Sequence, residues 1–340
     1  MRIVTDSKLR TQNPMIPQGI FHGKNQRSLV AADIGTTTIA MQLFDRNFEQ
    51  KEEFVQVNPQ VPYGADVLSR IQAAKEPQRA EEMRNLVVGV LEKGYEKFKN
   101  TGYFFDPLCV LVANTTMVYL LLGCDTTELG QYPFHATHLQ PYHGRIAGVE
   151  TVILPGLSAF VGSDITAGLK ACGMWKQKEL TPLIELGTNG EIVLGNDKKL
   201  VCCATAAGPA FEGGVNRGVW GADLMNFIAR LLQQGIVDET GLLADDYFEE
   251  GILIGNVRMT QASIRAIQLA KAAIAAGITI LSGHLGVSLL EVERIVLAGG
   301  FGYYLKPEDA LRIGLFGRDP AVSEKILYER IISGGNTALS

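Results

Sequence analysis

The chain contains few cysteines, and they are spaced in a way that excludes the usual cysteine-based metal centres. The five are Cys109, Cys124, Cys172, Cys202 and Cys203, with no C-x-x-C pair among them. Zinc ribbons and cysteine-ligated iron–sulfur clusters need grouped thiolates, so we expect no iron–sulfur cluster in this chain. The adjacent Cys202 and Cys203 fall in an expected strand, where neighbouring side chains point to opposite faces.

The sequence also lacks an excess of basic residues and a long apolar run. It has 31 Lys and Arg against 36 Asp and Glu, a formal charge of −5, whereas nucleic-acid binders usually present a basic surface. No apolar run reaches the roughly 18 residues of a membrane helix, and the first residues lack the apolar block of a signal peptide. We therefore expect no nucleic acid and no membrane as partners, and a cytoplasmic protein.

What is present is a strand–turn–strand pattern at residues 30–45, VAADIGTTTIAMQLFD. Its turn has an acid followed by a glycine and three hydroxyl residues: Asp33, Gly35, Thr36, Thr37 and Thr38. Glycine lets the backbone approach a ligand closely, and successive N–H groups in a turn bind anions. Taken alone, the hairpin is either an ordinary turn, for which Asp-x-Gly is common, or a phosphate site. In a phosphate site, the Asp33 carboxylate would be placed to hold Mg²⁺ through water.

A second segment, PLIELGTNGEIVL at residues 182–194, repeats this pattern. The corresponding positions are Glu185, Gly187, Thr188, Asn189 and Gly190, and the acids are 185 − 33 = 152 residues apart. Each hairpin opens a stretch in which strands and helices alternate, which is typical of an α/β layer arrangement. Apolar residues at helical spacing predict helices at residues 79–99 and 260–284, and Asn114 is expected to cap another helix. We expect an N-terminal arm (1–27) and two halves, 28–179 and 180–340, that face each other across a cleft.

Two glycine-rich loops follow in the second half. The loop AAGPAFEGG contains Gly208, Glu212 and Gly213, and places a carboxylate where a sugar hydroxyl could be bound. The later strand 294–298 ends in Gly299, Gly300 and Phe301, where the missing side chains leave room for a flat base.

Several polar residues permit two interpretations each. Asp164 either caps the helix that follows it or acts as a base or metal–water ligand. Asp66 and Arg70, four apart on a short expected helix, form either a surface ion pair or part of a site. His135, His138 and His143 lie in one loop, where surface positions are more usual than a metal site.

In this order, the motifs resemble the acetate and sugar kinase, Hsp70 and actin superfamily over roughly residues 28–317. The closer resemblance is to the ATPase domain of the reductive activators of corrinoid proteins. It is carried by AADIGTTT, NPQVPYGADVLSRIQAA, ANTTMVYLLLG, LPGLSAFVGSDITAGL, GTNGEIVLG, ATAAGPAFEGG, TQASIRAIQLAKAAIAAGI and VLAGGFG. This implies a two-lobed, actin-like and ribonuclease-H-like α/β ATPase with a nucleotide cleft between its lobes.

The resemblance further implies ATP and Mg²⁺ as cofactors, often a homodimer, and a corrinoid protein as the partner whose Co(II) is reduced to Co(I). Asp33, Asp164 and Glu185 would be catalytic, with Asp33 and Glu185 also holding Mg²⁺. The sequence departs from the family in two ways: it carries no fused iron–sulfur domain, so a separate low-potential electron donor is implied, and Glu185 stands where Asp is usual.

Two other functions are compatible with the same motifs. One is a small-molecule kinase, in which Asp164 deprotonates an acceptor hydroxyl. The other is an ATP-switched protein-binding module without a redox role, since Glu185 would alter hydrolysis while leaving nucleotide binding intact.

Overall fold

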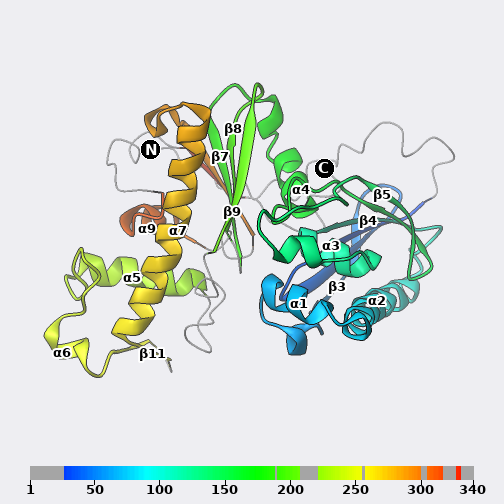
Figure 1. The fold of residues 1–340 in the computed structure, drawn as a ribbon, viewed down its shortest axis with the longest axis horizontal. Helices are drawn as coiled ribbons and strands as arrows, with labels where there is room; N and C mark the ends of the chain where they lie inside the picture. Colours follow the sequence, from blue (N-terminus) through cyan, green and yellow to red (C-terminus); the bar gives the residue numbers. More distant parts are fainter. Residues whose placement is uncertain are drawn as a thin grey trace. The chain divides into compact units, whose positions relative to one another are not determined.

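The computed structural model describes residues 27–187, 190–206, 221–254, 257–299, 305–316 and 327–330. These residues form two compact units, 27–171 and 172–330, which are described separately (Figure 1). Of the expected N-terminal arm, only Arg27 lies within the described residues. Residues 172–179 belong to the second unit, where Arg294 donates hydrogen bonds to the Gln177 side chain and the Cys172 carbonyl.

The first unit is built on a six-stranded sheet in the order β3-β2-β1-β4-β6-β5. Its strands are β1 (Leu29–Ile34), β2 (Thr38–Phe44), β3 (Gln50–Val57), β4 (Leu108–Ala113), β5 (Tyr142–Ile146) and β6 (Val149–Ile153). Its helices are α1 (Val67–Ala74), α2 (Pro77–Lys99), α3 (Thr115–Leu122) and α4 (Ser163–Ala171), with short 3-10 turns at Val61–Tyr63 and Thr127–Gly130. Strand β1 is antiparallel to β2 and parallel to β4, which is parallel to β6.

Helix α2 confirms the helix expected at residues 79–99 and covers part of this sheet. Its apolar stripe, which includes Met83, Val87 and Phe98, is buried in one cluster with Val30, Ala32 and other residues of the sheet. Charged residues occupy the opposite face of the helix. Packing in the core of the first unit therefore holds in place the sheet to which the first hairpin belongs.

The second unit contains a five-stranded sheet in the order β13-β12-β7-β8-β9 and a separate two-stranded ribbon. The strands are β7 (Thr181–Leu186), β8 (Gly190–Gly195), β9 (Leu200–Thr205), β12 (Arg294–Ala298) and β13 (Leu327–Arg330), and the ribbon is β10 (Ile252–Ile254) with β11 (Val257–Met259). The helices are α5 (Gly221–Gln233), α6 (Asp245–Phe248), α7 (Gln261–Leu285) and α9 (Pro307–Arg312), with 3-10 turns at Met174–Lys176 and Leu289–Glu291.

Five strands of the first sheet, all except the edge strand β5, have the same topology as the five strands of the second sheet. In the first, the antiparallel strands β3, β2 and β1 are followed by β4 and β6, both parallel to β1. In the second, β9, β8 and β7 are followed in the same way by β12 and β13. The similarity expected from two short motifs therefore extends to whole sheets, as in a duplicated α/β fold.

Helix α7 is the long helix expected from the apolar spacing at residues 260–284. Ile264, Ile267, Ile274 and Ile278 lie on a stripe that is buried in the core of the second unit, and the helix packs on β8 and β9 (Figure 1). By length and composition alone, α7 could also cross a membrane. A single such helix is weak evidence, and a core role accounts for its buried face.

Candidate functional site

The first hairpin forms as the sequence predicts, at the carboxyl end of β1. Asp33 is the penultimate residue of β1 and lies opposite Ala40 of β2 and Val112 of β4. The turn closes where the Gly35 N–H donates to the Thr38 carbonyl at 2.9 Å. A Cβ at Gly35 would lie 2.9 Å from that same oxygen, so glycine is needed for the turn to close. Thr37 and Thr38 are exposed, and Thr36 is buried.

Asn114 joins the first hairpin to the next strand. It caps α3 by accepting a hydrogen bond from the Met117 N–H at 3.0 Å, and its Nδ2 donates to the Thr36 hydroxyl at 3.1 Å. Strands β1 and β4 are parallel, with Ile34 opposite Ala113, so the residues after them lie side by side. The cap was predicted and is confirmed. The contact with Thr36 was missed, because it depends on the pairing of β1 with β4.

Asp164 lies near the same end of the sheet. The preceding Ser163 exchanges hydrogen bonds with the N–H and carbonyl of Ala113 at 2.9 and 3.1 Å. Gly162 packs so closely there that a Cβ would lie 2.4 Å from the Ala113 oxygen. Desolvation by burial raises the pKa of Asp164 to about 6, although the N–H of Ile165 donates to its carboxylate. This contact is with the next residue, whereas a capping side chain accepts from a residue two or three further on.

The second hairpin places its acid in the same position as the first. Glu185 is the penultimate residue of β7, opposite Glu191 of β8 and Ala298 of β12. Leu186 pairs with Gly190, whereas Ile34 pairs with Ile39, so the first turn is one residue longer. Gly190 thus corresponds structurally to Ile39 and not to Thr38. The predicted residues Thr188 and Asn189 lie outside the described residues.

Gly299 at the end of β12 lies directly against the second acid. Its φ is +84°, and a Cβ there would be 2.6 Å from Oε1 of Glu185 and 2.8 Å from the Leu186 carbonyl. A side chain at this position would therefore displace Glu185 or strain the backbone. The other predicted residues of the glycine loops, Gly208, Glu212, Gly213, Gly300 and Phe301, lie outside the described residues.

Glu191 was missed by the sequence reasoning. It is 6% exposed and faces Glu185 across the β7–β8 pair. Directly opposed residues of antiparallel strands project from the same face of a sheet, so the second hairpin presents two carboxylates. The signal was a glutamate within an otherwise apolar strand, which we had assigned no role.

A third group of residues, Asn58, Gln60 and Arg70, supports the first hairpin from within the unit. All three are 0% exposed. Arg70 donates to the Thr36 carbonyl at 2.6 Å, and Asn58 Nδ2 donates to the Gly35 carbonyl at 2.8 Å. Arg70 is therefore not at the surface, as the ion-pair interpretation required, because the guanidinium is buried. Asp66 instead caps α1 by accepting from the Ser69 N–H. Burial acts to raise the pKa of Asp66, but hydrogen bonds from Ser69 and, to a smaller extent, the charge of Arg70 lower it overall.

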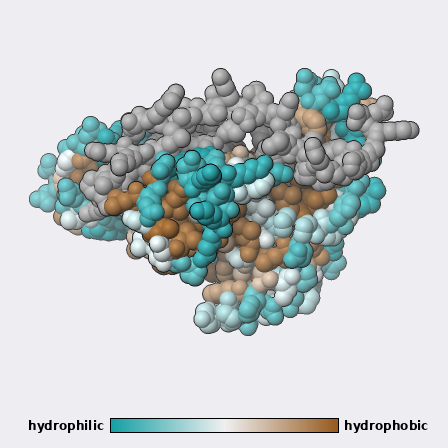
Figure 2. Space-filling view, turned by 90° about the horizontal axis from the view of Figure 1, so that it is seen from above, coloured by the Kyte–Doolittle hydropathy of each residue, from teal (hydrophilic) through white to brown (hydrophobic). Residues whose placement is uncertain are grey.

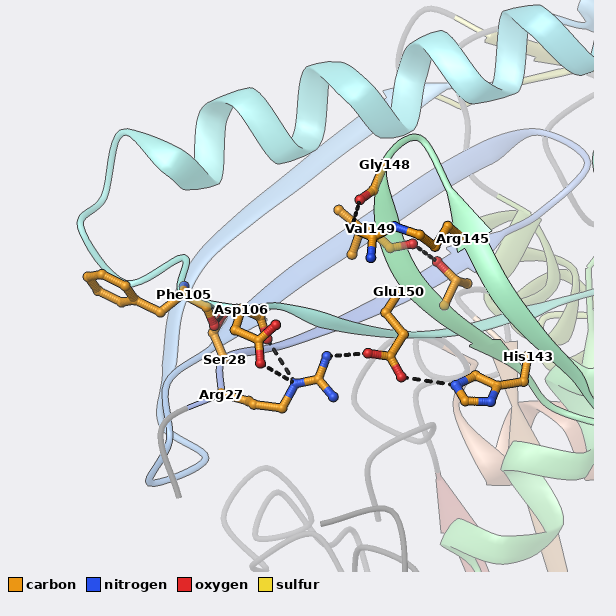
Figure 3. Close-up of polar contacts among 10 residues, drawn as sticks. Arg27, Ser28, Phe105, Asp106, His143, Arg145, Gly148, Val149 and Glu150 are labelled. Atoms are coloured by element: carbon orange, nitrogen blue, oxygen red, sulfur yellow. Dashed lines mark hydrogen bonds and ion pairs between the residues drawn. The ribbon is translucent and has the colours of Figure 1, made fainter. Parts of the chain in front are cut away.

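The three histidines do not converge on a metal site. His143 on β5 lies 3.0 Å from Glu150 of β6, which also accepts from Arg27 at 2.6 Å (Figure 3). These hydrogen bonds, chiefly that from Arg27, lower the pKa of Glu150. The network ties the start of the first unit to its sheet. Within the described ranges, no three His, Cys, Asp or Glu side chains are grouped to hold a metal ion.

A cavity of about 920 Å³ opens elsewhere in the second unit, between α5, α7 and the end of α9. Its lining includes Asp238, Lys271 and Arg312, and none of the predicted site residues. Hydrophobic and hydrophilic patches are mixed on the face of the molecule shown in Figure 2. Exposed apolar side chains, such as Val55 of β3 and Leu269 of α7, identify no binding surface when they are scattered.

Comparisons with known proteins agree with this architecture. The family model for the RACo middle region matches residues 29–177, and that for the C-terminal domain of RACo, the ASKHA domain, matches residues 179–218 and 215–340. The chain is 28% identical to the corrinoid activation enzyme RamQ of Eubacterium limosum over 84% of its own length and 60% of the relative. It also matches the structure of a reductive activator for corrinoid, iron–sulfur protein with a TM-score of 0.78 and 28% identity.

That structure is matched over 93% of this chain and 60% of its own length. The chain thus spans about three fifths of each relative. The two family models together cover nearly all residues from 29 onward, and the α/β architecture agrees with an ASKHA domain. The chain therefore belongs to the RACo family, the reductive activators of corrinoid proteins, and comprises that family's middle region and C-terminal ASKHA domain.

Proposed function

We propose that this chain is the ATP-dependent component of a corrinoid-protein activator. In this role it promotes the one-electron reduction of Co(II) to Co(I), with the electron supplied by a separate low-potential donor. The observation that carries the proposal is the pair of acid–glycine hairpins at Asp33 and Glu185, placed equivalently in two sheets that share a five-stranded topology. The reaction is taken from the functions for which the two relatives are named, corrinoid activation and reductive activation.

The residues of the hairpins fit a Mg²⁺–nucleotide complex. Mg²⁺ keeps most of its waters and is held in proteins by one or two carboxylates together with phosphate oxygens, which is what Asp33 and Glu185 offer. When bound, Mg²⁺ neutralises charge on the phosphate oxygens. The backbone and hydroxyls of Thr36, Thr37 and Thr38 would hold phosphate in the first hairpin. Gly187, Thr188, Asn189 and Gly190 would do so in the second.

The glycine loops would receive the nucleoside. Gly299, Gly300 and Phe301 would hold the adenine, and Gly208, Glu212 and Gly213 the ribose. Asp164 would accept a proton from the water that attacks the terminal phosphate, because a base must be deprotonated at the working pH and its pKa of about 6 allows this at neutral pH. We also propose a homodimer in the cytoplasm.

The test is the appearance of Co(I). The purified chain is mixed with a Co(II) corrinoid protein, a low-potential reductant and Mg-ATP, and the Co(I) absorption spectrum is followed. ATP should accelerate its appearance, whereas ADP should not. No effect of ATP with several corrinoid proteins would contradict the proposal.

A second function is favoured by one observation, the glutamate at position 185. Its extra methylene moves the carboxylate by about a bond length, and catalysis is sensitive to such displacements. The chain would then be an ATP-switched binding module without a redox role. Tight nucleotide binding with no phosphate release, even when the partner is present, would identify this alternative.

A further inference from the structure

Every carbonyl in the first phosphate turn accepts a hydrogen bond from a defined donor. The Gly35 carbonyl accepts from Asn58 Nδ2 at 2.8 Å, and the Thr36 carbonyl accepts from Arg70 Nη2 at 2.6 Å. The Thr37 carbonyl accepts from the Asn58 N–H at 2.8 Å, and the Thr38 carbonyl from the Gly35 N–H at 2.9 Å. Two buried side chains, Asn58 and Arg70, therefore control the orientation of the first peptide groups of the turn.

Because the peptide group is planar, the direction of each carbonyl also fixes the direction of the N–H group that follows it. In a trans peptide the carbonyl of one residue and the N–H of the next point in opposite directions, and the turn contains no cis bond. With the Gly35 and Thr36 carbonyls directed toward Asn58 and Arg70, the N–H groups of Thr36 and Thr37 point the other way. Two successive amides that point to one side form the kind of concavity that binds anions.

Arg70 is suited to this task because each of its three guanidinium nitrogens donates a hydrogen bond. Nε donates to the Gly64 carbonyl at 3.0 Å, Nη1 to Gln60 Oε1 at 3.0 Å, and Nη2 to Thr36. Gln60 is itself fixed by donating to the Met83 carbonyl of α2 at 3.0 Å. The guanidinium thus connects the turn to α1, to the Gly64 turn and, through Gln60, to α2. A lysine cannot supply this planar set of donors.

We propose that Arg70 is a positioning residue for nucleotide binding. Together with Asn58, it orients the Thr36 and Thr37 amides toward the phosphoryl oxygens of the nucleotide. Its buried positive charge, one peptide behind these amides, adds to their attraction for phosphate. This inference rests on the proposed ATP site, and assigns a role in it to residues that do not touch the ligand.

The first arm of the test needs no nucleotide. Hydrogen exchange of the segment 30–44 is compared in the wild-type chain and in Arg70→Met, Arg70→Lys and Asn58→Asp. Asn58→Asp is nearly isosteric and replaces the Nδ2 donor, which contacts the Gly35 carbonyl and Met117 Sδ, by a carboxylate oxygen that cannot donate. Exchange should be faster in all three variants. Arg84→Met is the matched control, since Arg84 also donates to a backbone carbonyl of this unit, that of Leu121, but away from the hairpin.

The second arm measures binding of Mg-ATP and of adenosine by calorimetry. Loss of Arg70 or of the Asn58 donor should weaken ATP binding by about 10- to 100-fold, as expected when a buried charge-assisted or amide hydrogen bond is lost. Adenosine, which has no phosphate, should bind to the variants as tightly as it binds to the wild-type chain. Arg70→Lys should lie between Arg70→Met and wild type, and Arg84→Met should behave as wild type.

Several outcomes would overturn the inference. One is unchanged exchange in Asn58→Asp and Arg70→Lys, and another is an equal loss of affinity for ATP and adenosine. If Arg70→Met does not fold, as judged by circular dichroism, the other two variants decide. A wild-type chain that fails to bind ATP would refute the proposed function, whereas normal ATP binding by the variants would refute the role of Arg70 alone.

Discussion

At the scale of single residues, Asp33 carries the most direct expectation. It is the penultimate residue of β1, next to the turn of the first hairpin, and no other acid precedes Gly35 in that hairpin. Asp33→Asn should lower the affinity for Mg²⁺ in the nucleotide complex by roughly 10- to 100-fold, the loss typical of weakened metal support. Phosphate release measured over a series of Mg²⁺ concentrations tests this. The exposed Asp246→Asn serves as the control, and unchanged Mg²⁺ dependence in Asp33→Asn would remove Asp33 from the site.

Asp164 should give the ATPase reaction a characteristic pH dependence. Burial raises its pKa to about 6, so the carboxylate is protonated below this pH and available as a base above it. The rate of ATP hydrolysis should rise between pH 5 and about 7. Asp164→Asn should lower the rate by about 10²- to 10⁴-fold, the usual contribution of a general base, and should abolish the rise. A profile that keeps the same inflection in this variant would exclude Asp164 as the base.

A rise in pH, which should increase activity through Asp164, should decrease the stability of the fold through the same carboxylate. The ordinary pKa is 3.8 and the folded value about 6, so the folded state binds the proton more tightly and loses stability as the pH rises between these values. Asp164→Asn, neutral at every pH, should raise the free energy of unfolding at pH 8 by about 1–2 kcal/mol. Near pH 4 it should change little. Urea denaturation at both pH values measures the difference, and equal effects would show that the charge is not responsible.

At the scale of elements, the sequence predicted whatever depends on local spacing. Both hairpins, α2 and α7 follow from residues separated by two to four positions, and the structure confirms them. The support of the first turn could not be predicted in this way. Asp66 is four residues before Arg70 and was its obvious partner, but the guanidinium reaches Thr36, 34 residues earlier in the chain. Glu191 was missed for a similar reason, because only the strand register shows that it faces Glu185.

The junction of β7 and β12 yields a prediction about Gly299. Gly299→Ala should destabilise the fold and weaken ATP binding, because its Cβ would collide with Glu185 and Leu186 at a φ of +84°. Gly235→Ala is the control, since Gly235 also has a positive φ, +71°, but nothing within 4 Å of a Cβ. The control should lose about 1–2 kcal/mol from backbone strain alone. Thermal unfolding without Mg-ATP measures the loss of stability in each variant, and the added stability with Mg-ATP reports its ATP binding. An equal loss in both variants would show that the contact with Glu185 has no effect.

At the scale of the whole molecule, the repeated topology explains why two short motifs 152 residues apart are informative. Each hairpin opens its sheet, and each sheet places a parallel strand beside it that ends in a further site candidate, Asn114 in one case and Gly299 in the other. The family models divide the chain between residues 177 and 179, close to the boundary of the two compact units at residues 171 and 172. The chain spans 60% of its relatives and lacks grouped cysteines, so a donor of electrons outside these residues is part of the proposal.

If the proposed nucleotide site draws on both units, ATP must protect both hairpins together. Hydrogen exchange in the presence of saturating Mg-ATP should slow in segments 30–44 and 182–194, and the chain should gain about 2.7 kcal/mol of stability at 100 times the dissociation constant. Asp33→Asn should reduce protection in both segments, as a shared site would require. The segment 142–153, which contains the Glu150 network at β5 and β6, is the internal control and should not change. Protection of only one hairpin would refute a shared site, since the unprotected hairpin would then have no contact with the phosphates.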